Sequence, residues 1–294
     1  MSKRVLIVGC GYVGLPLGQE LVRQGHHVFG LRRSDSQDPE LKAAGITPFH
    51  ADLTKPETLA SLPCDFDWIV NCAASSGGGV EDYRRLYLEG TRNLLERLST
   101  SPPQKYVYTS STSVYGQDDG SWVTESDATE PPTETGHILV ETEVLLRAAA
   151  KERNFPAVIL RVAGIYGPGR GFWFKQLLNN EARIEGNGER FLNMIHRDDV
   201  AGCIIAALKI GKPGEIYNAA DDEPVSQSDF FAWLAGQLNR AMPPSVPTDP
   251  NAGRKRGATN KRVSNLRLKQ QLGYQFKYPT FREGYAEEIN RVAR

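Results

Sequence analysis

Three glycines near the start of the chain have the spacing of a phosphate-binding turn. An apolar run at residues 5–8 passes directly into Gly9, Gly11 and Gly14 of the sequence GCGYVG, and a helical pattern follows. Gly9 permits a tight turn, Gly11 lets the backbone approach a pyrophosphate, and Gly14 lets the helix pack closely on the strand. The free amides and the positive dipole end of that helix attract an anion without any basic side chain. The pattern predicts a dinucleotide site formed by Gly9, Gly11, Tyr12, Val13 and Gly14.

Basic residues follow the second predicted strand, at a position where a carboxylate often contacts the ribose hydroxyls of NAD. This chain has Arg32, Arg33 and Ser34 there. A guanidinium pairs with a 2′-phosphate through charge-assisted hydrogen bonds, whereas a carboxylate would repel it. The sequence therefore favours NADP(H) as the cofactor. NAD(H) stays open, because Asp35 lies close by and arginines at a strand end can also be solvated surface.

Strand-like and helix-like segments alternate through the first half of the chain, which is typical of a parallel sheet with crossover helices. Past residue 166 the alternation weakens and prolines become frequent, notably between Pro243 and Pro250. We therefore predict an α/β protein with a Rossmann-type, doubly wound parallel sheet, helices on both faces, and a smaller mixed C-terminal lobe for the substrate. The predicted boundaries are 1–165 for the dinucleotide-binding domain, with a return segment near 191–222, and 166–190 plus 223–294 for the lobe.

Composition and charge argue against several other classes of protein. Lys plus Arg and Asp plus Glu each total 35, so the formal net charge is zero and gives no general attraction to nucleic acid or an anionic membrane. No run approaches the roughly 18 apolar residues of a membrane span, and the cysteines lack CxxC or metal-ligand spacing. His196 with Asp198 and Asp199 is not joined by further ligands, so we expect no metal. The cytoplasm is the expected location.

Further motifs are spread along nearly the whole chain. They are Asp52–Leu53, NCAA at 71–74, YLEGTRNLLE at 87–96, SSTSVYG at 110–116, RVAGIYGPG at 161–169, IHRDDVA at 195–201 and YNAADDEP at 217–224. Together with the glycine turn, they resemble the NAD-dependent epimerase/dehydratase family of the extended short-chain dehydrogenase/reductase superfamily. The resemblance implies a small-molecule substrate held between the nucleotide domain and the C-terminal lobe. It also implies that a homodimer can form through a four-helix interface.

The resemblance assigns roles to individual residues. Asp52 would meet the adenine, and Ala73 and Ala74 would line the cofactor channel. Ser111 would be the catalytic hydroxyl that polarises a substrate carbonyl. The residues that these segments add to the expected cofactor site are Asp52, Leu53, Cys72, Ala73 and Ala74.

One part of the family pattern is missing. Family members use a YxxxK pair on the helix after the serine strand, where the lysine lowers the pKa of the tyrosine so that the phenol can pass a proton. No tyrosine in this chain has a lysine four residues later. Alignment on Glu143 places Thr135 at the tyrosine position and Leu139 at the lysine position. The chain therefore resembles the atypical branch of the superfamily, which lacks the standard acid/base pair.

Other side chains are candidates for the missing proton donor. His137 lies near the position that lacks the tyrosine and its imidazole suits proton transfer, but two residues turn about 200° around a helix. Tyr166 follows a predicted strand whose carboxyl end should open on the cleft, although a packing aromatic is the competing interpretation. Tyr115 could likewise be either a proton donor at the cleft or a packing aromatic. We carry Ser111, Tyr166 and His137 forward as the catalytic candidates.

The C-terminal half gives hints about the substrate. Arg190 follows a glycine-rich turn but lies two residues before the position expected for a phosphate-binding arginine. A basic run at 254–256, with Lys261 and Arg262, could grip the diphosphate of a nucleotide sugar or form a solvated loop.

Two classes of function follow from these patterns. The first is an NADP-dependent oxidoreductase or epimerase-like enzyme that acts on a carbonyl or carbinol of a sugar, nucleotide sugar or other small polar metabolite. The second is a catalytically silent NAD(P)-binding sensor or scaffold, which the missing pair favours and the SSTSVYG motif disfavours. Fold alone does not decide between them.

Overall fold

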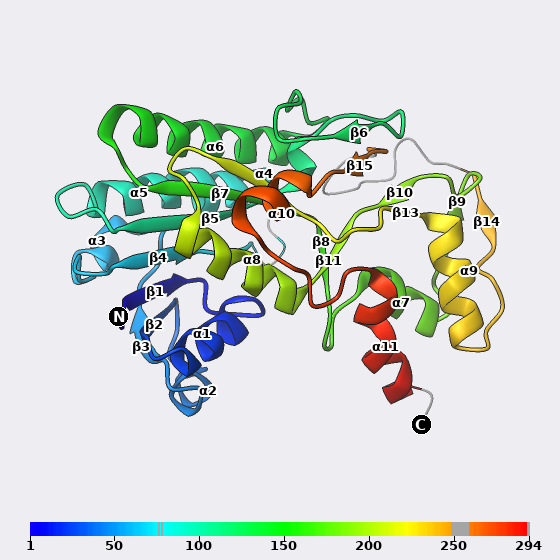
Figure 1. Ribbon diagram of the computed structural model, residues 1–294, viewed down its shortest axis with the longest axis horizontal. Coiled ribbons are helices and arrows are strands. Elements are labelled where there is room, and N and C mark those ends of the chain that lie inside the picture. The colour runs from blue at the N-terminus through cyan, green and yellow to red at the C-terminus, as the bar shows by residue number, and fades with distance from the viewer. Residues whose placement is uncertain (76, 78, 248–258, 293–294) are drawn as a thin grey trace.

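A seven-stranded parallel sheet forms the centre of the protein in the computed structural model, which describes residues 1–75, 77, 79–247 and 259–292 (Figure 1). The strand order is β12-β7-β5-β4-β1-β2-β3. The strands are β1 (Arg4–Val8), β2 (His27–Arg32), β3 (Thr47–His50), β4 (Trp68–Asn71), β5 (Lys105–Ser111), β7 (Ala157–Val162) and β12 (Ile216–Ala219). All six pairings between them are parallel, which confirms the predicted doubly wound sheet.

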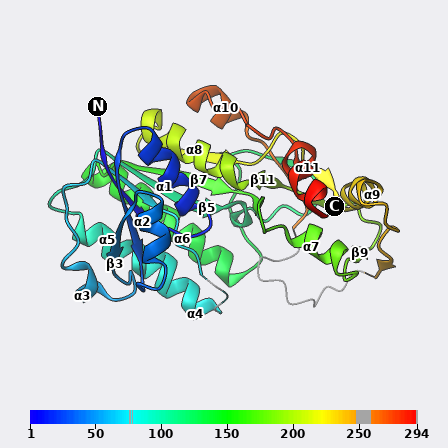
Figure 2. The same cartoon turned by 90° about the horizontal axis from the view of Figure 1, so that it is seen from below.

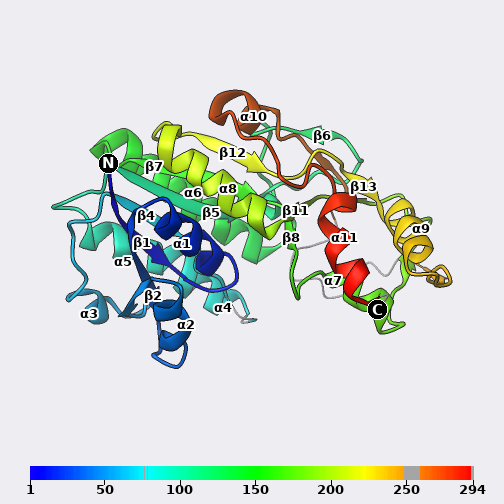
Figure 3. The same cartoon turned by 60° about the horizontal axis from the view of Figure 1, so that its bottom comes forward.

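Alternate residues of β1 contact two different hydrophobic clusters. Val5 and Ile7 pack in one cluster with residues of the helices α1 (Gly14–Arg23) and α8 (Arg197–Ile210). Leu6 and Val8 pack in the other with residues of α5 (Gly90–Arg97) and α6 (Glu134–Arg153). Because successive side chains of a strand point to opposite faces, the continuous apolar run VLIV matches a strand buried on both sides. Helices therefore cover both faces of the sheet (Figures 2 and 3).

The helices associated with the sheet range from four residues at α3 and α4 to 20 residues at α6. They are α1 (Gly14–Arg23), α2 (Asp38–Ala43), α3 (Pro56–Leu59), α4 (Val80–Tyr83), the π-helix η1 (Arg84–Glu89), α5 (Gly90–Arg97), the 3₁₀ turn η2 (Thr112–Val114), α6 (Glu134–Arg153), α8 (Arg197–Ile210) and α10 (Leu266–Leu272). α6 begins at a Thr133 cap, whose hydroxyl accepts a hydrogen bond from the Gly136 amide. This cap fixes where the helix starts beside the site.

The second half of the chain adds a smaller lobe with its own aromatic core (Figure 1). Its helices are α7 (Phe172–Leu178), α9 (Gln227–Gln237) and α11 (Phe281–Val292). Within the described residues, four two-stranded pairs accompany them: β6 (Trp122–Val123) with β15 (Arg262–Val263), β8 (Gly164–Tyr166) with β11 (Met194–His196), β9 (Ile184–Glu185) with β14 (Ser245–Val246), and β10 (Phe191–Leu192) with β13 (Val225–Ser226). The lobe is mixed, as predicted, whereas the exact domain boundaries stay a prediction.

Candidate functional site

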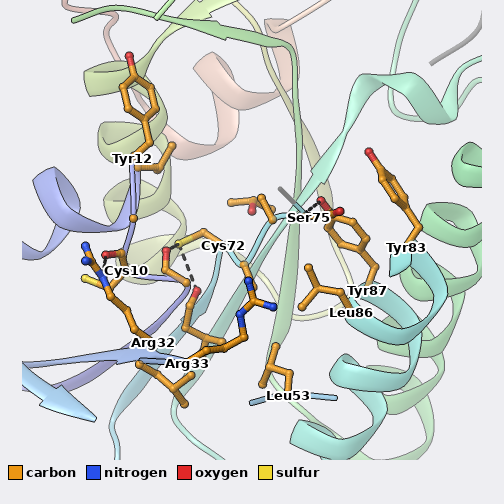
Figure 4. A pocket seen from close by; sticks show the side chains of 18 of the residues that line it. Cys10, Tyr12, Arg32, Arg33, Leu53, Cys72, Ser75, Tyr83, Leu86 and Tyr87 are labelled. Carbon is orange, nitrogen blue, oxygen red and sulfur yellow. Dashed lines mark hydrogen bonds between the residues drawn. The ribbon is translucent and has the colours of Figure 1, made fainter. Parts of the chain in front are cut away.

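A cavity of about 770 Å³ opens at the carboxyl ends of the central strands (Figure 4). The turns after β1, β2, β3 and β4 and the end of β5 all contribute to its wall, because parallel strands end at the same edge of the sheet. Every residue predicted to contact the cofactor lines this cavity except Gly14. The lining set is Gly9, Gly11, Tyr12, Val13, Arg32, Arg33, Ser34, Asp52, Leu53, Cys72, Ala73 and Ala74.

The glycine turn leaves its backbone open to the cavity. Gly9 has φ +82°, and a Cβ there would lie 2.5 Å from the Cα of Ala73, just after the neighbouring strand β4. A Cβ on Gly11 would meet nothing within 4 Å, so the absence of a side chain keeps this part of the cavity empty. Gly14 does not line the cavity but packs against the turn, where a Cβ would lie 2.7 Å from the Gly9 carbonyl oxygen. α1 begins there without a side-chain cap. The Leu15 amide donates to the Gly11 carbonyl at 2.8 Å, whereas the amides of residues 12–14 have no partner among the described residues, which suits an anion.

The two predicted arginines behave differently. The Arg32 Nε donates to the Cys10 carbonyl at 2.5 Å, and its guanidinium also pairs with Gln37 and with Glu40 of α2. Arg33 is exposed and has no hydrogen bond or ion pair within the described part of the chain. Figure 4 shows its guanidinium extending into the cavity. Arg33 is therefore the arginine available to a ligand, whereas Arg32 supports the turn.

Asp52 shapes the wall beyond β3. Its Oδ1 accepts hydrogen bonds from the Thr54 amide at 3.0 Å and the Thr54 hydroxyl at 2.9 Å. The Leu53 carbonyl accepts a hydrogen bond from Asn93 of α5, which ties this loop to the helix. Among the residues that the structure describes, no hydrogen bond reaches the second carboxylate oxygen of Asp52.

The two cysteines that line the cavity, Cys10 and Cys72, are thiols whose pKa is raised by burial. Burial raises the pKa of the Cys10 thiol to about 12, and burial also raises the pKa of Cys72. The Cys72 Sγ donates towards the Val8 and Gly9 carbonyls, both at 3.4 Å. Because a thiolate is the reactive form of cysteine, neither residue suits nucleophilic chemistry near neutral pH.

Ser111 is the last residue of β5 and lies on the cavity wall. Its Oγ accepts a hydrogen bond from the Ser113 amide at 3.2 Å, so the hydroxyl proton is still available to a substrate oxygen. The preceding Ser110 donates to Glu143 of α6 at 2.6 Å, and Arg161 binds the same carboxylate through Nε and Nη2. This buried ion pair fixes the end of β5 against α6.

The start of α6 presents no proton donor to the cavity. Leu139 is buried and lines the wall. Thr135 is partly buried beside Thr133, with 3.2 Å between the two hydroxyl oxygens, and it does not line the cavity. The two positions that hold tyrosine and lysine in the resembled family are thus filled by groups that cannot exchange a proton near neutral pH.

The other catalytic candidates from the sequence lie outside the cavity. His137 is exposed on the outside of α6, because its position on the helix points away from Leu139. Tyr166 is buried in the lobe core, stacked on Tyr285 with ring centroids 4.4 Å apart, and burial raises its pKa. Tyr115 is also buried, and its hydroxyl donates to Asn218 at 2.8 Å. None of the three lines the cavity.

Sequence reasoning missed several residues that do line the cavity. Tyr83 and Tyr87 enter it from α4 and the π-helical segment η1, and Arg170 enters from the turn after β8. The Tyr87 hydroxyl accepts a hydrogen bond from the Ser75 amide at 3.1 Å (Figure 4). The sequence shows the two tyrosines four residues apart on a helix, but that spacing alone does not reveal which surface they face.

Basic residues of the C-terminal half have mixed environments. Arg190 lies over the Trp173 ring at 5.7 Å. The Lys261 amino group donates to the Tyr115 carbonyl at 3.1 Å, and its burial, together with Arg190, lowers its pKa to about 8. Arg262 stacks on Phe191 at 4.9 Å. The basic run 254–256 lies outside the described residues.

The histidine and aspartates of IHRDD have structural partners. The His196 Nδ1 accepts from the Asp198 amide at 3.2 Å, and Asp199 accepts from the Tyr274 hydroxyl at 2.7 Å. Over the described ranges, no group of three or more His, Cys, Asp or Glu side chains could hold a metal ion. No helix among these residues is long and apolar enough to cross a membrane.

A parallel doubly wound sheet with a glycine turn at its carboxyl edge defines a dinucleotide-binding protein of the Rossmann class. The chain belongs to the NAD dependent epimerase/dehydratase family, whose model matches residues 5–220. It is 28% identical over 292 residues to the Escherichia coli K12 protein YeeZ, covering 94% of this chain and 97% of that one.

Solved structures share the complete fold. A Methylobacillus flagellatus protein, provisionally described as an NAD-dependent epimerase/dehydratase, is 32% identical with a TM-score of 0.79, and each chain is covered fully. The dTDP-glucose 4,6-dehydratase DesIV of Streptomyces venezuelae, solved with NAD and TYD bound, has a TM-score of 0.84 at 21% identity, over 98% of this chain and 96% of that one. At that identity the second likeness concerns the fold alone.

Proposed function

We propose that this protein is an NADP(H)-dependent oxidoreductase or epimerase-like enzyme that acts on a carbonyl or carbinol of a sugar-like or other small polar metabolite. One observation supports this proposal: a single cavity is lined by the open glycine turn, by Arg33 and by Ser111. Bound NADP(H) would supply hydride transfer there.

The residues of the cavity fit a dinucleotide. The glycine-turn amides and the start of α1 would hold the diphosphate, and Asp52 would face the adenosine. Arg33 would pair with the 2′-phosphate, because its guanidinium has no competing partner within the described residues. NAD(H) would use the same wall without the Arg33 contact.

We further propose that Tyr87 gives the substrate oxygen its proton. Asn71 of β4 and Tyr108 of β5 are partners in register; Ser75 follows the first by four residues and Ser111 follows the second by three. Neighbouring strands lie about 4.8 Å apart. The Ser75 amide holds the Tyr87 hydroxyl by a hydrogen bond, so this hydroxyl and the Ser111 hydroxyl lie on adjacent parts of the cavity wall. The hydrogen bond donated by Ser75 also stabilises the phenolate left after proton transfer.

The competing function is an NAD(P)-binding sensor or scaffold without turnover. The apolar Leu139 side chain on the cavity wall favours it, because the position that holds the phenol-activating lysine in the family is occupied by leucine. In this case the cofactor would bind normally and alter only the interaction with a partner.

Thermal unfolding in the presence of NADP⁺, NADPH, NAD⁺ or NADH tests the cofactor assignment, because a ligand that binds the folded state raises its apparent stability. We expect the phosphorylated pair to give the larger increase in Tm. No increase with any of the four would contradict both functions.

A substrate screen then separates the enzyme from the sensor. Absorbance at 340 nm would report a net oxidoreductase, through NADPH with keto-sugars. An epimerase-like enzyme returns the hydride to its substrate and leaves the cofactor unchanged, so its products from UDP-glucose and dTDP-glucose would be detected by chromatography. In the enzyme, Ser111→Ala and Tyr87→Phe abolish most of the turnover while NADP⁺ affinity stays unchanged. Cofactor binding without turnover on any compound supports the sensor. The homodimer and the cytoplasmic location stay predictions.

A further inference from the structure

A guanidinium from outside the glycine turn faces the same cavity. Arg170 lines the cavity together with Gly11 and Tyr12. Its side chain is exposed, and its guanidinium carbon lies 5.0 Å from the centroid of the Tyr12 ring. Within the described ranges it has no hydrogen bond or ion pair from its side chain. The positive charge of Arg170 is therefore available to a ligand.

A tight turn holds Arg170 in this position. The Gly167 amide donates to the Arg170 carbonyl at 3.0 Å, and the Arg170 amide donates to the Gly167 carbonyl at 2.8 Å. Gly169 has φ +68°, a conformation that favours glycine. The Tyr12 hydroxyl donates to the Pro168 carbonyl at 3.2 Å, so the glycine turn and this second turn are directly joined.

A second arginine at the same tyrosine has a different environment. The Arg197 guanidinium carbon lies 5.3 Å from the Tyr12 centroid, but its Nε and Nη2 bind Asp198 Oδ1 at 3.0 and 2.9 Å. Arg197 does not line the cavity. Glu288, whose charge also acts on Tyr12, pairs with Arg291 at 2.9 Å. Of the two arginines, only Arg170 combines access to the cavity with a charge that no described carboxylate neutralises.

We propose that Arg170 binds the diphosphate bridge of the dinucleotide beside the glycine turn, and thereby ties the segment leading into the smaller lobe to the cofactor. The inference rests on the proposed function, because it needs a dinucleotide in the cavity. The glycine turn offers only amides to a group with two negative charges, whereas the guanidinium fork adds charge-assisted hydrogen bonds.

Isothermal titration of the full-length variants with defined fragments tests this role. The probes are NADP⁺, NAD⁺ and ADP-ribose, which contain the diphosphate, and adenosine 2′-monophosphate, which does not. Arg170→Ala should weaken the first three by about tenfold or more and leave the fourth unchanged, since charge-assisted hydrogen bonds to the diphosphate are lost. Arg170→Lys should recover part of the affinity.

Arg197→Ala is the matched control, because it removes the other guanidinium at the Tyr12 ring without changing the cavity wall. We expect wild-type affinity for all four probes, and melting temperatures without ligand show whether each variant is folded. Wild-type affinity of Arg170→Ala for ADP-ribose overturns the proposal, as does an equal loss for adenosine 2′-monophosphate. Failure of the unmutated protein to bind any dinucleotide overturns the proposed function and this inference with it.

Discussion

The turn after β1 and the start of α6 both border the cavity, yet they match the family pattern to different degrees. The turn has all three glycines, and it offers backbone amides and empty space. The helix has Thr135 and Leu139 in place of the proton-transfer pair. Binding through the backbone depends on conformation and on the absence of side chains, whereas proton transfer depends on particular functional groups. The first can therefore be complete while the second is absent or supplied from another element.

The largest expected effect concerns the ion pair beneath the α6 end of the cavity. Glu143→Ala leaves the Arg161 charge buried and uncompensated, since both side chains are nearly inaccessible. We expect the free energy of unfolding to fall by about 3–5 kcal/mol in urea denaturation. Glu141→Ala is the control on the same helix; its exposed pair with Arg84 contributes about 1 kcal/mol or less. Equal losses in the two variants would contradict the structural role assigned to Glu143.

Alanine substitutions at two glycines separate the backbone conformation of the turn from the space that it leaves for a cofactor. Gly9→Ala places a Cβ 2.5 Å from the Ala73 Cα in a backbone with φ +82°, and we expect a loss of about 2 kcal/mol or more in unfolding free energy. Gly11→Ala meets no neighbour, so its stability should stay within about 0.5 kcal/mol of wild type while its dinucleotide affinity falls. Normal dinucleotide binding by Gly11→Ala would show that the cofactor does not approach this turn.

The neighbouring residues Arg32 and Arg33 allow a comparison between an arginine that supports the glycine turn and one that would bind the cofactor. Arg33→Ala should lower the affinity for NADP⁺ by about tenfold or more and leave NAD⁺ unchanged, because only the 2′-phosphate loses its partner. Arg32→Ala removes contacts to the Cys10 carbonyl and Glu40, so it should lower Tm and weaken both cofactors to the same degree. Titration calorimetry checks both results. A loss of NADP⁺ preference in Arg32→Ala alone would reverse the assignment.

The smallest effect at pH 7 is expected at Lys261. In Lys261→Met the lost hydrogen bonds to Tyr115 and Thr259 offset the removal of a buried charge, so the change should be within about 1 kcal/mol.

The pH dependence of that variant is more informative. The pKa of Lys261 is about 8 in the folded protein, against 10.5 for an ordinary lysine. Between these values the unfolded chain binds more protons, so the wild type should gain stability relative to Lys261→Met as the pH rises from 8 to 10.5. Denaturation at several pH values measures the difference, with the exposed Lys151→Met as control. A constant difference would mean that the amino group is not desolvated.

Much of the fold and of the cofactor wall could be predicted from the sequence, because the signals are local. Apolar strands followed by turns and helices have their own periodicity, and the carboxyl edge of a parallel sheet brings successive turns together without knowledge of side-chain packing. Whether a catalytic candidate reaches the cavity depends instead on contacts with residues that are distant in the sequence. Tyr166 has the expected position after a strand, but Tyr285, more than a hundred residues later, stacks on it inside the lobe.

The sequence by itself determined the glycine turn, the parallel sheet and the absence of the tyrosine–lysine pair, since these follow from residue type and spacing. Only the tertiary structure decided that Arg33 rather than Arg32 lacks a partner among the described residues, and that Tyr87 and Arg170 rather than His137 and Tyr166 line the cavity. The physical reason is that the availability of a charge or a hydroxyl depends on every neighbour that could neutralise or bury it. Those neighbours come from elements that are remote along the chain.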